Sequence, residues 1–192
     1  MLIGEIYIKG FIRNDLTFSL CGLNCSLCPM KIDNYCPGCG GGAGNQSCAI
    51  ARCSLEHGGI TYCFECSEYP CEKYKDIDVY DSFITHRNQL NDMEKAQNIG
   101  IDLYHSQITS KQEILKYLLE NFNDGRRKTL FCLAVNLLEL NDIGSIIHQL
   151  KTDITDGMSK KEKATIAVKH FEDIALQRGI ALKLNKMPKK IK

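Results

Sequence analysis

The sequence predicts an α-rich chain, of the α+β class with few short strands, in which an irregular metal-stapled Cys-rich module packs on a small helical domain. Two observations lead to this prediction. Ten of the eleven cysteines lie between Cys21 and Cys71, in a segment with three of the four prolines, a run of glycines and no sustained periodicity. From Asp81 onward, apolar residues recur at helical spacing and capping signals separate them.

We therefore expect three regions along the 192 residues, a length that suits one sizeable domain or two small ones. Residues 1–19, in which apolar residues alternate loosely, form an N-terminal extension or a short strand. Residues 20–75 form the Cys-rich metal-binding module. Residues 76–192 form a helical domain with a basic C-terminal tail.

Three helices are expected in the first part of the helical domain. One ends near Gly100, because glycine suits the position after a helix end. Ser110-Lys-Gln-Glu113 has the pattern of a capping box that begins a second helix, which Asp124-Gly125 stops. Residues 127–140 are apolar over most of their surface, as in a central helix, and contain Cys132 as a small buried hydrophobe.

Two further helices and a strand are expected after that. Asp142 is a predicted N-cap of the next helix. Ser159-Lys-Lys-Glu162 is a second capping box, which opens a helix that ends at Gly179. Ile180-Ala-Leu-Lys-Leu184 is a candidate short strand.

The cysteines follow the spacing of metal ligands. Their runs are Cys21-x3-Cys25-x2-Cys28, Cys36-x2-Cys39, Cys48-x4-Cys53 and Cys63-x2-Cys66-x4-Cys71. Two thiolates separated by two residues reach one ion from a tight turn, and two such turns complete a tetrahedral zinc site. A segment so rich in turns buries too little apolar surface to offset its chain entropy, so we expect bound metal to serve as its core. Ten thiols suffice for about two zinc ions with four thiolates each.

The spacing also suggests which thiols share an ion. The first predicted site takes the two CxxC pairs that face each other, Cys25, Cys28, Cys36 and Cys39. The second predicted site takes thiols that follow in the sequence, Cys48, Cys53, Cys63 and Cys66. Cys21 and Cys71 are then spare, and either competes for a place as an additional ligand. His57 is an alternative ligand to a thiolate, or a solvent-facing loop histidine.

Other uses of the same cysteines have to be weighed. A disulfide scaffold is disfavoured because the cysteine total is odd and no export signal is visible. An iron–sulfur cluster remains an alternative, since sets of four cysteines hold both kinds of metal centre. The spacing of Cys21, Cys25 and Cys28 matches that of radical enzymes using S-adenosylmethionine, but the alternating strands and helices of their barrel are not predicted here.

Composition narrows the function. The chain has 24 lysines and arginines against 23 aspartates and glutamates, and no membrane span is predicted. We expect a cytoplasmic zinc-binding protein whose metal is structural and whose surface binds a macromolecular partner, with protein favoured over nucleic acid. The alternative is a metal- or thiol-dependent enzyme or an iron–sulfur electron carrier. Phosphate-binding and dinucleotide motifs are missing, and catalytic residues are not identified.

Three cysteine motifs together resemble those of a known family. They are Cys21-Gly22-Leu23-Asn24-Cys25-Ser26-Leu27-Cys28-Pro29, Cys36-Pro37-Gly38-Cys39, and Cys63-Phe64-Glu65-Cys66 with Glu68-Tyr69-Pro70-Cys71. In this order they resemble the Cys-rich bacterial and archaeal family catalogued as domain of unknown function 3795, over about residues 20–105. The resemblance implies metal binding through these positions, and it implies no activity.

Overall fold

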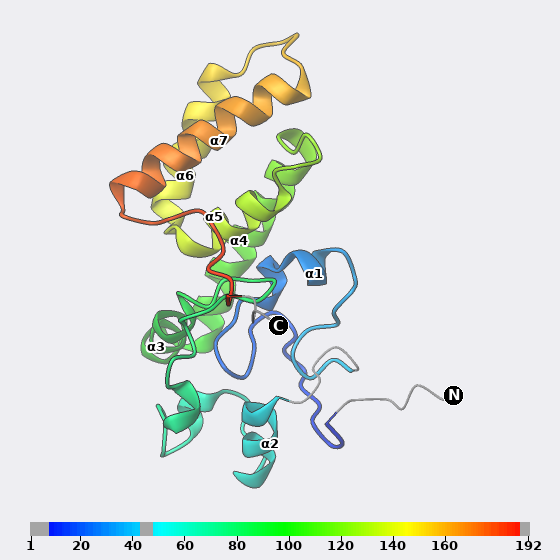
Figure 1. Cartoon of the computed structure of the whole chain (residues 1–192), viewed down its shortest axis with the longest axis vertical. Coiled ribbons are helices and arrows are strands. Elements are labelled where there is room, and N and C mark those ends of the chain that lie inside the picture. Colours follow the sequence, from blue (N-terminus) through cyan, green and yellow to red (C-terminus); the bar gives the residue numbers. More distant parts are fainter. Residues whose placement is uncertain (1–7, 43–47, 189–192) are drawn as a thin grey trace, which may run out of the picture. The chain divides into compact units, whose positions relative to one another are not determined.

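A computed structural model describes residues 8–42 and 48–188 of the chain (Figure 1). The described residues are rich in helix and form no β-strand. The α-rich class is therefore confirmed, but the few short strands are wrong for this part of the chain. Residues 180–184 run without a partner strand, so they have no ladder to join. Of the strand expected within 1–19, residues 8–19 are irregular and residues 1–7 lie outside the description.

The chain divides into two compact units, one within Met1–His105 and Asn185–Lys192, the other Ser106–Leu184. This division differs from the one expected at residue 76. The reason is that residues after 76 bond to the Cys-rich segment. Asn24 donates a hydrogen bond of 2.8 Å to Asp92 and accepts one of 2.9 Å from the Tyr104 hydroxyl.

Short helices and turns make up the first unit (Figure 1, blue to green). They are the 3₁₀ helices η1 (Cys25–Leu27), η2 (Cys63–Glu65) and η3 (Glu72–Tyr74), with the α-helices α1 (Pro29–Ile32), α2 (Ala49–Glu56) and α3 (Gln89–Ile99). Their core is apolar after all: Phe18 is fully buried, with ring centroids 5.8 Å from Tyr62 and 4.7 Å from Tyr104. The Cys-rich segment thus gains apolar burial from residues that lie later in the chain.

Four helices build the second unit, the first of them entering from the first unit. They are α4 (Ile101–Asn121), α5 (Lys128–Leu137), α6 (Leu140–Asp153) and α7 (Lys160–Gln177). Phe131 of α5 and Phe171 of α7 are fully buried, with ring centroids 5.8 Å apart. Cys132 is buried in α5, as expected from its apolar surroundings.

The helix boundaries test the capping signals. Ser159 accepts from the Glu162 N–H and Glu162 accepts from the Ser159 N–H, so the second capping box is confirmed. The box at Ser110 is wrong, because α4 already runs from Ile101 and Ser110 lies inside it, donating to the Ser106 carbonyl. The apolar face of α4 begins upstream, with buried Tyr104, and this burial outweighs the local capping signal.

Two other termini can be checked. Gly100 and Gly179 have φ angles of 86° and 68° at the ends of α3 and α7, as expected of glycines that terminate helices. Asp142 is not an N-cap, since α6 begins at Leu140 after Glu139. Instead, Asp142 lies in the first turn of α6 and forms an ion pair with Arg178, with a shortest N–O distance of 2.6 Å.

Candidate metal centre

All ten clustered cysteines belong to the first unit, and all ten are free thiols. They fall into two groups. The N-terminal thiol group comprises Cys21, Cys25, Cys28, Cys36, Cys39 and Cys48. The C-terminal thiol group comprises Cys53, Cys63, Cys66 and Cys71.

Cys25 is central to the N-terminal thiol group. Burial first, and then the negative charges of the neighbouring Cys39, Cys28 and Cys36, raise the pKa of the Cys25 thiol to about 12, against a lowering by the Cys39 N–H. The four thiols of the first predicted site are therefore neighbours. Cys21, which sequence reasoning left spare, also lies here: burial raises its pKa, and Cys39, Cys48 and Cys25 add to the effect. A dication would reverse this mutual repulsion among thiolates.

Backbone amides point at the sulfur atoms of the same group. The N–H groups of Met30 and Lys31 bond to Cys28, because α1 begins directly after Cys28 and its first amides have no partner inside the helix. The Cys39 N–H bonds to the Cys25 thiol, and the Leu20 N–H bonds to Cys39. N–H donors around sulfur are the support that thiolate ligands of metals require.

The C-terminal thiol group lines a cavity of about 20 Å³, which we call the thiol cavity. Its other lining residues include His57, Tyr69 and Tyr74. Helix α2 contributes Cys53, and η2 and the turns after it contribute the other three thiols. Burial first, and then the charges of Cys71, Cys53 and Cys48, raise the pKa of Cys63 to about 11, against a lowering by the Tyr74 hydroxyl, so Cys48 of the N-terminal thiol group also lies near this one. The cavity therefore brings in Cys71, which the sequence left spare, and Cys48 is not among its lining residues.

His57 lies at the C-terminal end of α2, on the wall of the thiol cavity. Its Nδ1 is 2.9 Å from the Cys53 carbonyl oxygen and 3.6 Å from the Cys53 sulfur. Its Nε2 is 3.7 Å from a Glu68 carboxylate oxygen. The Cys53 carbonyl and then the Glu68 carboxylate raise the pKa of His57. Both ring nitrogens of His57 thus lie near acceptor oxygens.

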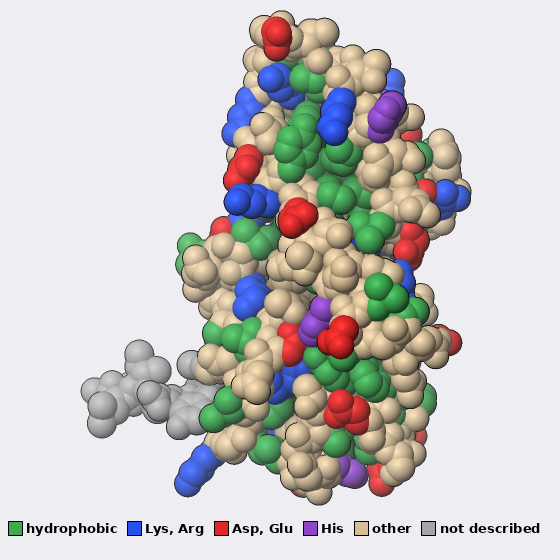
Figure 2. Space-filling view, turned by 180° about the vertical axis from the view of Figure 1, so that it is seen from behind, with side chains coloured by type: hydrophobic (Ala, Val, Ile, Leu, Met, Phe, Trp, Pro, Cys, Tyr) green, Lys and Arg blue, Asp and Glu red, His purple; other side chains and the backbone are tan. Residues whose placement is uncertain are grey.

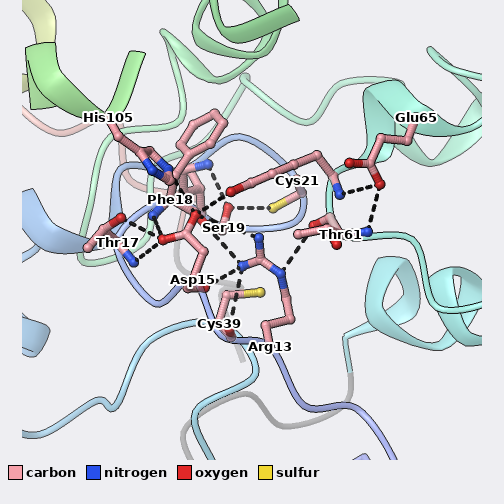
Figure 3. A network of polar contacts seen from close by, with 12 residues as sticks. Arg13, Asp15, Thr17, Phe18, Ser19, Cys21, Cys39, Thr61, Glu65 and His105 are labelled. Carbon is pink, nitrogen blue, oxygen red and sulfur yellow. Dashed lines mark hydrogen bonds and ion pairs between the residues drawn. The ribbon is translucent and has the colours of Figure 1, made fainter. Parts of the chain in front are cut away.

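A polar network beside the N-terminal thiol group was missed by the sequence analysis (Figure 3). The Asp15 carboxylate accepts hydrogen bonds from the N–H and hydroxyl of Thr17 and from the Tyr62 hydroxyl, at 2.8, 2.6 and 2.8 Å, and lies 3.2 Å from the His105 Nε2. Burial raises the pKa of Asp15, but these donors together outweigh it and leave the pKa lowered. The one signal in the sequence is Asp15-Leu16-Thr17, an acceptor two residues before a donor, as in an Asx turn.

The donor set fits a soft metal ion. Within residues 8–42 and 48–188, no group of three or more His, Cys, Asp or Glu side chains already stands in a metal-binding arrangement. The candidate ligands are nevertheless all thiols, which select zinc or iron–sulfur clusters over hard cations. A cavity of this volume has room for one atom-sized occupant.

Residues 17–76 match the family described as protein of unknown function (DUF3795). The resemblance read from the cysteine motifs is thereby confirmed, over a shorter range than expected. Neither the curated proteins nor the solved structures contain a match to the chain. Among the residues that the structure describes, no helix is both long and apolar enough to cross a membrane.

Proposed function

We propose that this chain is a cytoplasmic zinc-binding protein with about two ions, both structural. The observation that carries the proposal is the thiol cavity, where four cysteines from three short elements surround a space of about 20 Å³. Four thiolates around one ion make a tetrahedral zinc site. The four thiols that line this space are enough to fill the coordination shell of one zinc ion, and the iron–sulfur cluster stays the alternative.

The second ion is assigned to the N-terminal thiol group. Cys25, Cys28, Cys36 and Cys39 are its proposed ligands, because Cys25 neighbours the other three and amide donors support three of the four sulfurs. Cys21 and Cys48 lie beside Cys39 and are the alternative ligands. A reducing compartment keeps all these thiols available for metal.

A structural role follows from the ligand count. A zinc ion with four protein thiolates has no open position for water or substrate, so it does not activate either. Its contribution is to folding, since the loops that carry the thiols are short and largely irregular. The proposed metal ions therefore stabilise loops that regular secondary structure does not stabilise.

A protein partner is proposed for the loop that precedes α3. Val79, Tyr80 and Phe83 are exposed there, and Phe83 is 64% exposed. Met187 is exposed on the segment that bonds to this loop through Asn185. Aromatic side chains and methionine are enriched in protein interfaces. On the face in Figure 2, the acidic and basic side chains of the described residues are interspersed, with no continuous basic patch for a nucleic acid backbone.

The test is elemental analysis and native mass spectrometry of protein purified without oxygen. We expect about two zinc ions per chain and no absorption in the visible range. A matched pair of variants locates them: Cys63→Ser should remove one ion, and Cys132→Ser, in the second unit, should remove none. A brown protein that releases sulfide on acidification, or a folded protein without metal, would overturn the proposal.

A further inference from the structure

Arg13 is a buried cation beside the N-terminal thiol group. Its side chain is 3% exposed. Its Nε donates to the Thr61 carbonyl at 3.2 Å, and its Nη1 lies 2.9 Å from the Phe18 carbonyl and 3.5 Å from that of Cys39. One guanidinium thus ties together three loops of the first unit. These bonds use Nε and Nη1 only.

The remaining nitrogen, Nη2, has no hydrogen-bond partner among the described residues although it is buried. Its ion pair with Asp15 is long, at 3.9 Å, because other donors already occupy that carboxylate. In Figure 3 the guanidinium is drawn between the sulfur atoms of Cys21 and Cys39. Burial raises the pKa of the Cys39 thiol, while the Arg13 charge and a hydrogen bond from the Arg13 side chain lower it. The Cys21 sulfur is 3.3 Å from the Ser19 hydroxyl oxygen.

A buried donor without a partner requires an explanation, since leaving one unsatisfied costs about 1–3 kcal/mol. A structural role as a link between loops accounts for Nε and Nη1 but leaves Nη2 unused. An anionic acceptor at the thiols accounts for all three nitrogens. A zinc ion with four thiolates carries a net charge of −2, which is costly to bury without a compensating cation.

We infer that Arg13 is a positioning residue for the metal of the N-terminal thiol group, where its Nη2 donates to a zinc-bound thiolate and its charge offsets the anionic site. The inference rests on the proposed zinc binding and extends it to one specific side chain. Arg13 would then make this site hold its ion more tightly and leave its thiolates less reactive.

The thiol cavity provides an internal comparison. Its corresponding buried donor is the Tyr74 hydroxyl, which also has no oxygen or nitrogen partner among the described residues and lies beside Cys63. Tyr74 is neutral, whereas Arg13 carries a charge. Loss of this one donor should therefore change the metal affinity of the two sites to different extents.

The first experiment measures the affinity of each ion by chelator competition in wild type, Arg13→Gln, Arg13→Lys and Tyr74→Phe. Arg13→Gln should weaken the ion of the N-terminal thiol group about 10- to 100-fold and leave the other ion unchanged. Arg13→Lys, which keeps the charge, should lose less. Tyr74→Phe should affect only the ion of the thiol cavity. Equal weakening of both ions by Arg13→Gln, or of neither, would overturn the inference.

A second experiment needs no variant, and so it does not depend on Arg13→Gln folding. The wild-type protein is loaded with an NMR-active cadmium isotope, and scalar coupling to cadmium is recorded through the N–H···S hydrogen bonds. The Leu20 amide, which bonds to Cys39, is the positive control. Coupling to an Arg13 guanidinium proton is expected; coupling at Leu20 without it would refute the role of Arg13. Wild-type protein that binds no metal in either experiment would instead refute the proposed function.

Discussion

Replacing Cys71 by serine distinguishes between two assignments of the metal ligands, the one that the structure supports and the one that the sequence spacing suggests. Spacing leaves Cys71 spare and places Cys48 in the second site. The structure places Cys71 in the wall of the thiol cavity, which Cys48 does not line. Cys71→Ser should therefore weaken one ion and Cys48→Ser should leave that ion in place.

The size of the effect follows from the ligand count. A structural zinc site contributes roughly 10–16 kcal/mol of apparent binding free energy at neutral pH. Shared equally among four thiolates, this is about 2.5–4 kcal/mol for each ligand. Because a tenfold change in affinity corresponds to about 1.4 kcal/mol, loss of Cys71 should weaken that ion on the order of 100- to 1,000-fold.

Competition with a chromophoric zinc chelator under anaerobic conditions measures this loss, and native mass spectrometry counts the ions that remain. Cys132→Ser is the matched control, because Cys132 is buried in α5 of the second unit. The structural grouping is refuted by a Cys71→Ser variant that keeps both ions at wild-type affinity while Cys48→Ser loses one.

Three further predictions concern the fold. Gly22→Ala should destabilise the first unit by about 3 kcal/mol in chemical denaturation, because Gly22 has a φ of 99° and an added Cβ would lie 2.6 Å from a carbonyl oxygen of α3; a negligible change would contradict this. In thermal unfolding, Ser159→Ala should cost about 1 kcal/mol and Ser110→Ala less than about 0.5 kcal/mol; the reverse order would restore Ser110 as a cap. The hydrogen bonds from Arg178 lower the pKa of Asp142, so this pair should stabilise the fold above about pH 4 and lose its effect as the pH falls through the lowered pKa. Arg178→Met should raise that pKa in an NMR titration, and an unchanged value would exclude the pair as its cause.

The helices of the second unit could be predicted because their signals are local. The apolar face of α7, its capping box at Ser159 and the terminating Gly179 all lie within one stretch of sequence. The signal at Ser110 failed for the same reason, since a capping box is judged from four residues. The upstream apolar residues Tyr104 and Ile108 extend the helix through it, and both are buried.

The grouping of the thiols could be predicted only in part. Spacing identifies pairs that reach one ion from a single turn, as with Cys25 and Cys28, but it does not identify which distant pair completes the site. The identity of the second pair depends on the path that the connecting loops take in space. Here the turn before η3 brings Cys71 to Cys63. The Arg13 network was missed because its bonds join positions up to 90 residues apart, with little local signal.

The segment that matches the family does not complete its own core. Residues 17–76 carry the thiols, but Gln89 donates to the Cys21 carbonyl at 2.8 Å, and Tyr104 both packs on Phe18 and bonds to Asn24. A chain ending at residue 76 would leave a phenylalanine and an asparagine amide without the partners that bury them, at a cost that metal binding would have to offset. The unit that carries the clustered thiols is therefore longer than the segment that matches the family, and it includes α3 and the first turn of α4.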